Sequence, residues 1–148
     1  MLPAMKLAVV FVLVASTAWA KDTAKACDPA APVLIEVRTI DLSASTTHVT
    51  TLHVSGAWAA HDLDKAKKES HAVTGCAKDV EPVVKALAKS KWTVTKAKVK
   101  CMAVATSQTE YVIQNKVVWT AKLCSGDILD ADSAAAVDLI DQTIASLR

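Results

Sequence analysis

The segment from Trp92 to Cys124 constrains the fold of this chain more than any other stretch. Residues 92–101 and 111–124 both alternate between polar and apolar side chains and are rich in β-branched residues, and a polar break separates them. Alternation with a period of two is typical of strands that bury one face and expose the other. We therefore predict one long β-hairpin over residues 92–124 that turns at Ser107-Gln108.

The four cysteines predict a disulfide-stabilised chain. Cys27, Cys76, Cys101 and Cys124 form no Cys-x-x-Cys motif, and an even number in a small exported domain indicates two disulfides. In a regular hairpin, Cys101 and Cys124 would lie roughly 33 Å apart along the sheet. A disulfide requires a Cα separation of about 4.4–6.8 Å. The predicted helix before Trp92 would run back over the hairpin for about 20 Å, the length of about six strand residues, and would place Cys76 near Cys101. We therefore predict the pairs Cys76–Cys101 and Cys27–Cys124.

The N-terminus has the pattern of a secretory signal peptide. Lys6 precedes an apolar run over residues 7–15, and Ala18-Trp19-Ala20 supplies small residues at the two cleavage-site positions. The apolar run is about half as long as a membrane span requires. We expect cleavage after Ala20, no transmembrane segment in the mature chain, and a secreted or periplasmic location.

After the predicted signal peptide (residues 1–20), we expect an extended lead-in over 21–32 and one α+β domain over 33–148. Residues 33–40 and 47–55 are predicted as strands. Helical spacing of apolar residues predicts a solvated helix over 62–72 and amphipathic helices over 79–90 and 132–147. The order β-β-α-β-β-α predicts a four-stranded antiparallel sheet with helices packed on one face.

Lysines form the clearest charged feature of the chain. Lys96, Lys98 and Lys100 alternate with apolar residues, so in a strand they would share one face with Lys116 and Lys122 of the neighbouring arm. This pattern predicts a binding surface for an anionic protein, polymer or membrane surface. A solvated sheet face, or an edge strand that lysines protect from association, is the alternative.

The overall charge argues against nucleic acid as the partner. The mature chain has 16 Lys and Arg residues (17 less Lys6) against 15 Asp and Glu, so its net charge is close to zero. General nucleic-acid binders are distinctly basic.

A second hypothesis places a divalent metal ion at His61, Asp62, Asp64 and His71. Imidazole and carboxylate groups are suitable ligands, but their spacing matches no known ligand signature. A solvated, charged segment is the other interpretation. This hypothesis would make the protein a metal-binding domain or a metal-dependent hydrolase.

Motifs of common catalytic classes are absent from the sequence. It contains no Gly-x-Ser-x-Gly or His-Glu-x-x-His motif, and its three glycines cannot form a glycine-rich phosphate loop. We therefore assign no catalytic residue and no cofactor. The leading prediction is an exported, disulfide-stabilised binding or inhibitor-like domain without catalytic activity. A structural component of the cell envelope or extracellular space is a further alternative.

Overall fold

A computed structural model describes residues 27–147 of the 148-residue chain. The predicted signal peptide and residues 21–26 of the lead-in lie outside the described part. No helix within 27–147 is long and apolar enough to cross a membrane.

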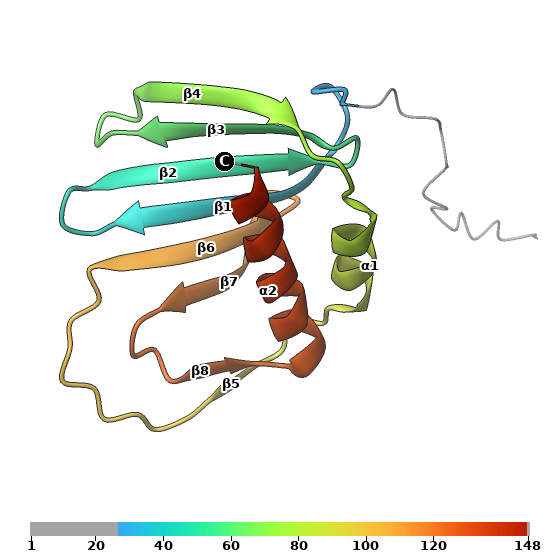
Figure 1. The fold of residues 1–148 in the computed structure, drawn as a ribbon. Coiled ribbons are helices and arrows are strands. Elements are labelled where there is room, and N and C mark those ends of the chain that lie inside the picture. Colours follow the sequence, from blue (N-terminus) through green and yellow to red (C-terminus); the bar gives the residue numbers. More distant parts are fainter. Residues whose placement is uncertain (1–26, 148) are drawn as a thin grey trace, which may run out of the picture.

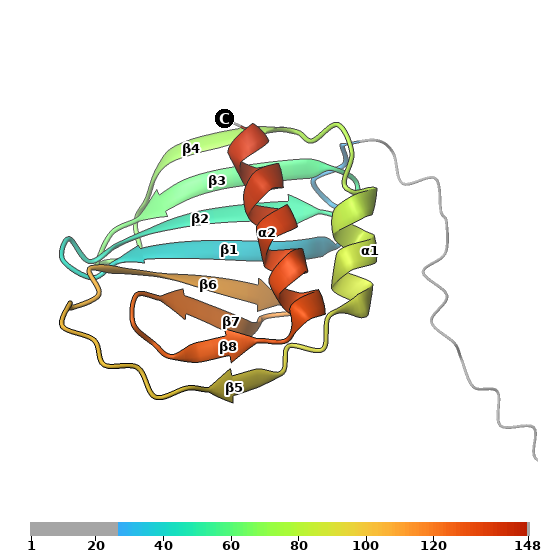
Figure 2. The ribbon, with the colours of Figure 1, turned by 60° about the horizontal axis from the view of Figure 1, so that its bottom comes forward.

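The main element is a six-stranded antiparallel sheet in the order β4-β3-β2-β1-β6-β7 (Figure 1). Its strands are β1 (Val33–Asp41), β2 (Thr46–His53), β3 (Ala57–Leu63), β4 (Glu69–Cys76), β6 (Ser107–Ile113) and β7 (Lys116–Lys122). A second sheet pairs β5 (Val94–Lys96) with β8 (Asp127–Leu129). The helix α2 (Ala131–Ser146) runs across the main sheet, and α1 (Glu81–Lys89) lies beside it near the strand ends (Figure 2).

The core lies between the main sheet and the two helices. Ile35 and Leu52 of the sheet, Val83 of α1 and Ile140 of α2 are at most 1% exposed and belong to one packed cluster. Burying such side chains contributes about 1.5–3 kcal/mol each. The predicted strands 33–40 and 47–55 and the helices 79–90 and 132–147 are confirmed to within a few residues.

The predicted four-stranded sheet is wrong, and one reason is the segment predicted as a helix over 62–72. This segment contributes to the hairpin of β3 and β4, which extends the sheet beyond β2. Its charged residues form the turn, where the carboxylate of Asp64 accepts hydrogen bonds from the backbone N–H groups of Ala66 and Lys68 at 2.8 and 2.9 Å. Pairing with β2 therefore overrides the weak helical spacing.

The predicted hairpin over 92–124 is also wrong in its turn and its pairing. The hairpin in this region joins β6 to β7 and turns at Gln114 and Asn115, whose φ angles are 50° and 62°. Two consecutive positive φ angles are typical of a type I′ turn. β6 also pairs with β1, whereas β5 pairs with β8, and residues 97–106 form a long loop. Alternation identified strand-like segments but carried no information about their partners.

Two disulfides are present, as predicted, but their pairing differs from the prediction. Cys27 is bonded to Cys76 and Cys101 to Cys124, with Cα separations of 5.5 and 5.7 Å. The geometric exclusion of the second pair assumed a regular hairpin that turns at Ser107. Because 97–106 is a loop, Cys101 lies beside Cys124, which follows β7.

Candidate functional site

The predicted lysine face is divided between the two ends of β7. Lys96 ends β5, and Lys98 and Lys100 lie in the following loop rather than in a strand. Lys122 pairs with Gln108 near the end of that loop. Lys116 starts β7 and therefore lies about 20 Å away along the seven-residue strand. Four of the five predicted residues thus lie on segments at one end of the sheet, and their binding role stays a prediction.

We name residues 96–106 the lysine loop. Besides its three lysines, it exposes three large apolar side chains: Val99 is 53% exposed, Val104 is 87% exposed, and Met102 is fully exposed. Single exposed apolar residues are common on proteins, but three within six positions form a local patch that water solvates poorly. The three apolar residues are visible in the sequence, but the alternating pattern predicts a half-buried hairpin at these positions instead of an exposed loop.

Three connections anchor the lysine loop to the rest of the structure. Near its start, the N–H of Ala97 donates to the carbonyl of Gly126 at 2.8 Å. In its middle, Cys101 is bonded to Cys124. At its end, the carbonyl of Thr106 accepts from the N–H of Leu42 at 2.9 Å. The loop is long, but its attachments restrict how far the exposed side chains can move.

Gly126 is the residue that allows the first of these connections. Its φ angle is +68°, and a Cβ atom there would lie 2.4 Å from the carbonyl oxygen of Ala97. Only glycine has neither a steric penalty at this φ nor a Cβ that would block the approach.

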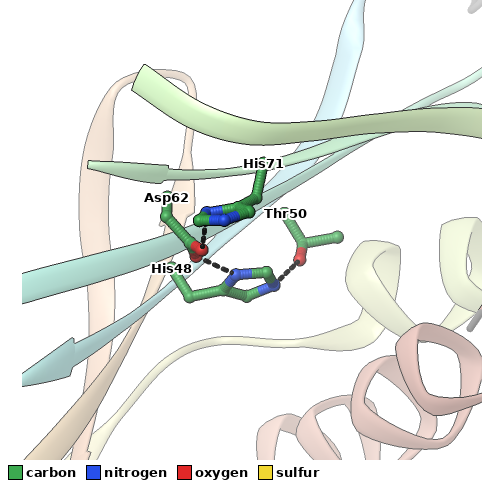
Figure 3. A network of polar contacts seen from close by, with 4 residues as sticks. All are labelled: His48, Thr50, Asp62 and His71. Atoms are coloured by element: carbon green, nitrogen blue, oxygen red, sulfur yellow. Dashed lines mark hydrogen bonds and ion pairs between the residues drawn. The ribbon is translucent and has the colours of Figure 1, made fainter. Parts of the chain in front are cut away.

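A separate polar network joins three neighbouring strands of the main sheet (Figure 3). Nδ1 of His48 on β2 lies 2.7 Å from one carboxylate oxygen of Asp62 on β3, and Nδ1 of His71 on β4 lies 3.4 Å from the other. The hydroxyl of Thr50 lies 3.5 Å from Nε2 of His48. The hydrogen bond with His48 is the largest cause of the lowered pKa of Asp62, and the charge of His71 contributes less.

This network brings together two of the four predicted metal ligands, Asp62 and His71. His61 is adjacent to Asp62 in β3 and therefore faces the other side of the sheet, where it lies 3.8 Å from Glu69. Asp64 accepts the hydrogen bonds of the β3–β4 turn. Within residues 27–147, no group of three or more His, Cys, Asp or Glu residues has the geometry of a metal site. The predicted cluster is therefore not formed.

His48 is a partner of Asp62 that the sequence patterns did not predict. The two residues are 14 positions apart and meet because β2 and β3 pair in the register His48↔Asp62. No local motif carries that information, and our helix prediction over 62–72 excluded the pairing.

Carboxylate, imidazole and hydroxyl follow one another in the order Asp62, His48, Thr50, which is the order of a catalytic triad. Thr50, however, is only 5% exposed. The contact between Thr50 and His48 is also at the upper limit of hydrogen-bond length. The contacts of the network link β2, β3 and β4, and they do not by themselves indicate catalysis.

Comparison of the chain with protein-family models, with curated proteins and with solved structures finds no match.

Proposed function

We propose that this protein is an exported, non-catalytic binding domain that attaches to an anionic lipid surface through the lysine loop. The observation that carries the proposal is the combination, on one anchored loop, of three lysines with three exposed apolar side chains. The signal-peptide pattern of residues 1–20 and the two disulfides support export, because disulfides persist in oxidising compartments.

A lipid surface suits this loop better than a soluble anionic polymer does. Lysines near an anionic membrane contribute about 1 kcal/mol each through attraction to the headgroups. Val99, Met102 and Val104 can enter the boundary between headgroups and acyl chains, where burial of apolar area adds to the attraction. A polysaccharide would satisfy the lysines but would leave these apolar side chains in water.

Vesicle sedimentation tests the electrostatic part of the proposal. The mature chain, residues 21–148, should bind vesicles that contain phosphatidylglycerol and not vesicles of phosphatidylcholine alone. The triple variant K96E/K98E/K100E should bind the anionic vesicles at least about 100-fold more weakly, because three contributions of about 1 kcal/mol are lost.

The β3–β4 turn provides a matched control with the same change in charge. Lys65, Lys67 and Lys68 are exposed and lie outside the lysine loop. The variant K65E/K67E/K68E should retain most of the vesicle binding. Equal losses in the two triple variants would show a non-specific charge effect and would contradict the proposal.

The apolar part of the proposal has its own test. Salt screens the lysines but not the apolar contacts. The double variant M102S/V104S should therefore lose the binding that remains at high salt while it keeps most of the binding at low salt.

If soluble polyglutamate bound as tightly as the anionic vesicles, the partner would be an acidic polymer or protein instead of lipid.

A further inference from the structure

A cavity of about 440 Å³ lies between the start of β1, the helix α1 and the turn that joins β6 to β7. Its walls are Val33, Leu34, Val84, Leu87, Ala88, Trp92, Ile113 and Gln114. Seven of these eight side chains are apolar, Gln114 supplies an amide, and none is charged. The cavity lies at the end of β7 opposite Lys122, so it is distinct from the lysine loop.

Trp92 adopts an unfavourable backbone conformation in the wall of this cavity. Its φ angle is 56°, in the left-handed region that a bulky side chain rarely occupies. Such a conformation costs on the order of 1–3 kcal/mol and persists only where neighbouring groups impose it.

The N-terminus of α2 supplies the groups that hold Trp92. The backbone N–H of Trp92 donates to the hydroxyl of the fully buried Ser133, and the N–H of Thr93 donates to the carboxylate of Asp130, both at 2.8 Å. Asp130 is also the N-cap of α2. The helix cap therefore fixes the backbone that carries the indole in the cavity wall.

Gln114 is the second wall residue with a positive φ angle, 50°. The first central position of a type I′ turn favours Asn, Asp or Gly. Glutamine at this position has a longer side chain, and its amide provides both a donor and an acceptor. It is the single side chain among the eight described wall residues that can accept a hydrogen bond, whereas the indole of Trp92 can only donate one.

We infer that this cavity binds a small, uncharged and mainly apolar molecule that carries one hydrogen-bonding group for Gln114. Its volume falls in the range of about 300–1,000 Å³ that is typical of small-molecule sites. A stable protein interface needs about 20–30 residues on each side. The eight wall residues are therefore too few for a second copy of the chain or another folded protein.

Titration with N-phenyl-1-naphthylamine, an uncharged fluorescent apolar probe, tests this inference on the mature chain. One saturable site is expected. Ala88 is exposed on α1 and lines the cavity, so Ala88→Trp should fill the cavity and weaken binding at least about tenfold. Ala135→Trp makes the same change at an exposed position of α2 that does not line the cavity, and it should leave the affinity unchanged.

An NMR titration of the unmodified protein gives an answer that does not depend on how the variants fold. The probe should shift the indole N–H signal of Trp92 and the side-chain amide signals of Gln114. Failure to saturate, equal losses in the two tryptophan variants, or shifts centred on the lysine loop would each overturn the inference.

Discussion

The hydroxyl of Tyr111 on β6 donates a hydrogen bond to the carboxylate of Asp141 on α2, whose two oxygens lie 2.9 and 3.0 Å away. Tyr111 is only 2% exposed, so this contact connects the buried face of β6 to the helix that crosses the sheet. Burial, more than the neighbouring carboxylate, raises the pKa of Tyr111 far above its usual value. The phenol therefore stays protonated and remains a donor throughout the physiological range.

The contact predicts a measurable loss of stability in Tyr111→Phe. Removal of the hydroxyl takes this donor from the carboxylate of Asp141, an exposed residue that water can rehydrate, and a hydrogen bond to a charged group contributes about 1.5–3 kcal/mol. We expect a decrease in the free energy of unfolding near the lower end of that range, measured by urea denaturation. Asp141→Asn keeps an acceptor for the hydroxyl and should cost less. Equal stability of Tyr111→Phe and the unmodified protein would show that the contact contributes nothing.

The interaction of Asp62 with His48 predicts a specific pH dependence of stability. The folded-state pKa of Asp62 lies below the ordinary value of 3.8, chiefly because of the hydrogen bond with His48. A carboxylate with a lowered pKa stabilises the folded state above its unfolded pKa, and the stabilisation is lost as pH falls through the folded pKa. Asp62→Asn and His48→Gln should therefore both flatten the decline in Tm that begins near pH 4 and continues below it.

The control for this pH profile is Asp138→Asn, a change at an exposed position in the middle of α2, away from the helix N-terminus. This variant should show the same fall in Tm between mildly acidic and strongly acidic conditions as the unmodified protein. If Asp62→Asn gave the same acid profile as this control, the network of Figure 3 would have no influence on acid stability.

The disulfide pairs predict both a peptide map and an order of stabilities. Non-reducing digestion should yield Cys27 joined to Cys76 and Cys101 joined to Cys124. The two bonds close loops of 49 and 23 positions, which correspond to about 4 and about 3 kcal/mol in the chain-entropy model. C27S/C76S should therefore lower Tm more than C101S/C124S. Recovery of Cys76 joined to Cys101 would contradict the structure of the whole loop region.

At the edge of the main sheet, Gly75 leaves no room for a larger side chain. It pairs with Trp58 across β3 and β4, and a Cβ atom on it would lie 2.8 Å from three atoms of the indole ring. Gly75→Ala should displace the ring and cost about 1–3 kcal/mol, the usual range for overpacking. Urea denaturation monitored by tryptophan fluorescence measures both effects. Thr74→Ala, an exposed change on the same strand, should stay within about 0.5 kcal/mol of the unmodified protein.

The helices and the first hairpin were predictable because their signals are local. Val83 and Ile140 follow helical spacing, and both are buried in the core. The hydrogen bonds at the helix starts are local too. Asp130, the N-cap of α2, accepts from the N–H of Ser133 at 3.0 Å, and Asp79, which precedes the N-cap Val80 of α1, accepts from the N–H of Glu81 at 2.9 Å. A side chain within three residues of a helix start can satisfy its N–H groups whatever the rest of the chain does.

The candidate sites depended on pairings that no local signal encodes. Placing the turn at Ser107 rather than at Gln114 was enough to displace the lysines from their predicted common face and to exchange the disulfide partners. The meeting of His48 with Asp62 required β3 to be recognised as a strand, but Ala57-Trp58-Ala59-Ala60 shows no alternation. The cavity of Trp92 is assembled from three segments that are distant in the sequence, residues 33–34, 84–92 and 113–114.

The sequence by itself determined the strands β1 and β2, both helices and the oxidation of all four cysteines, because helical period, alternation and composition act within a few residues. Tertiary structure alone decided the six-stranded order, the disulfide partners, the lysine loop and the cavity. These features arise where distant segments exclude water together, and the free energy of that burial depends on which surfaces meet. A period of two or 3.6 specifies which face of a segment is apolar, but the partner of that face is chosen by the packing of the whole chain.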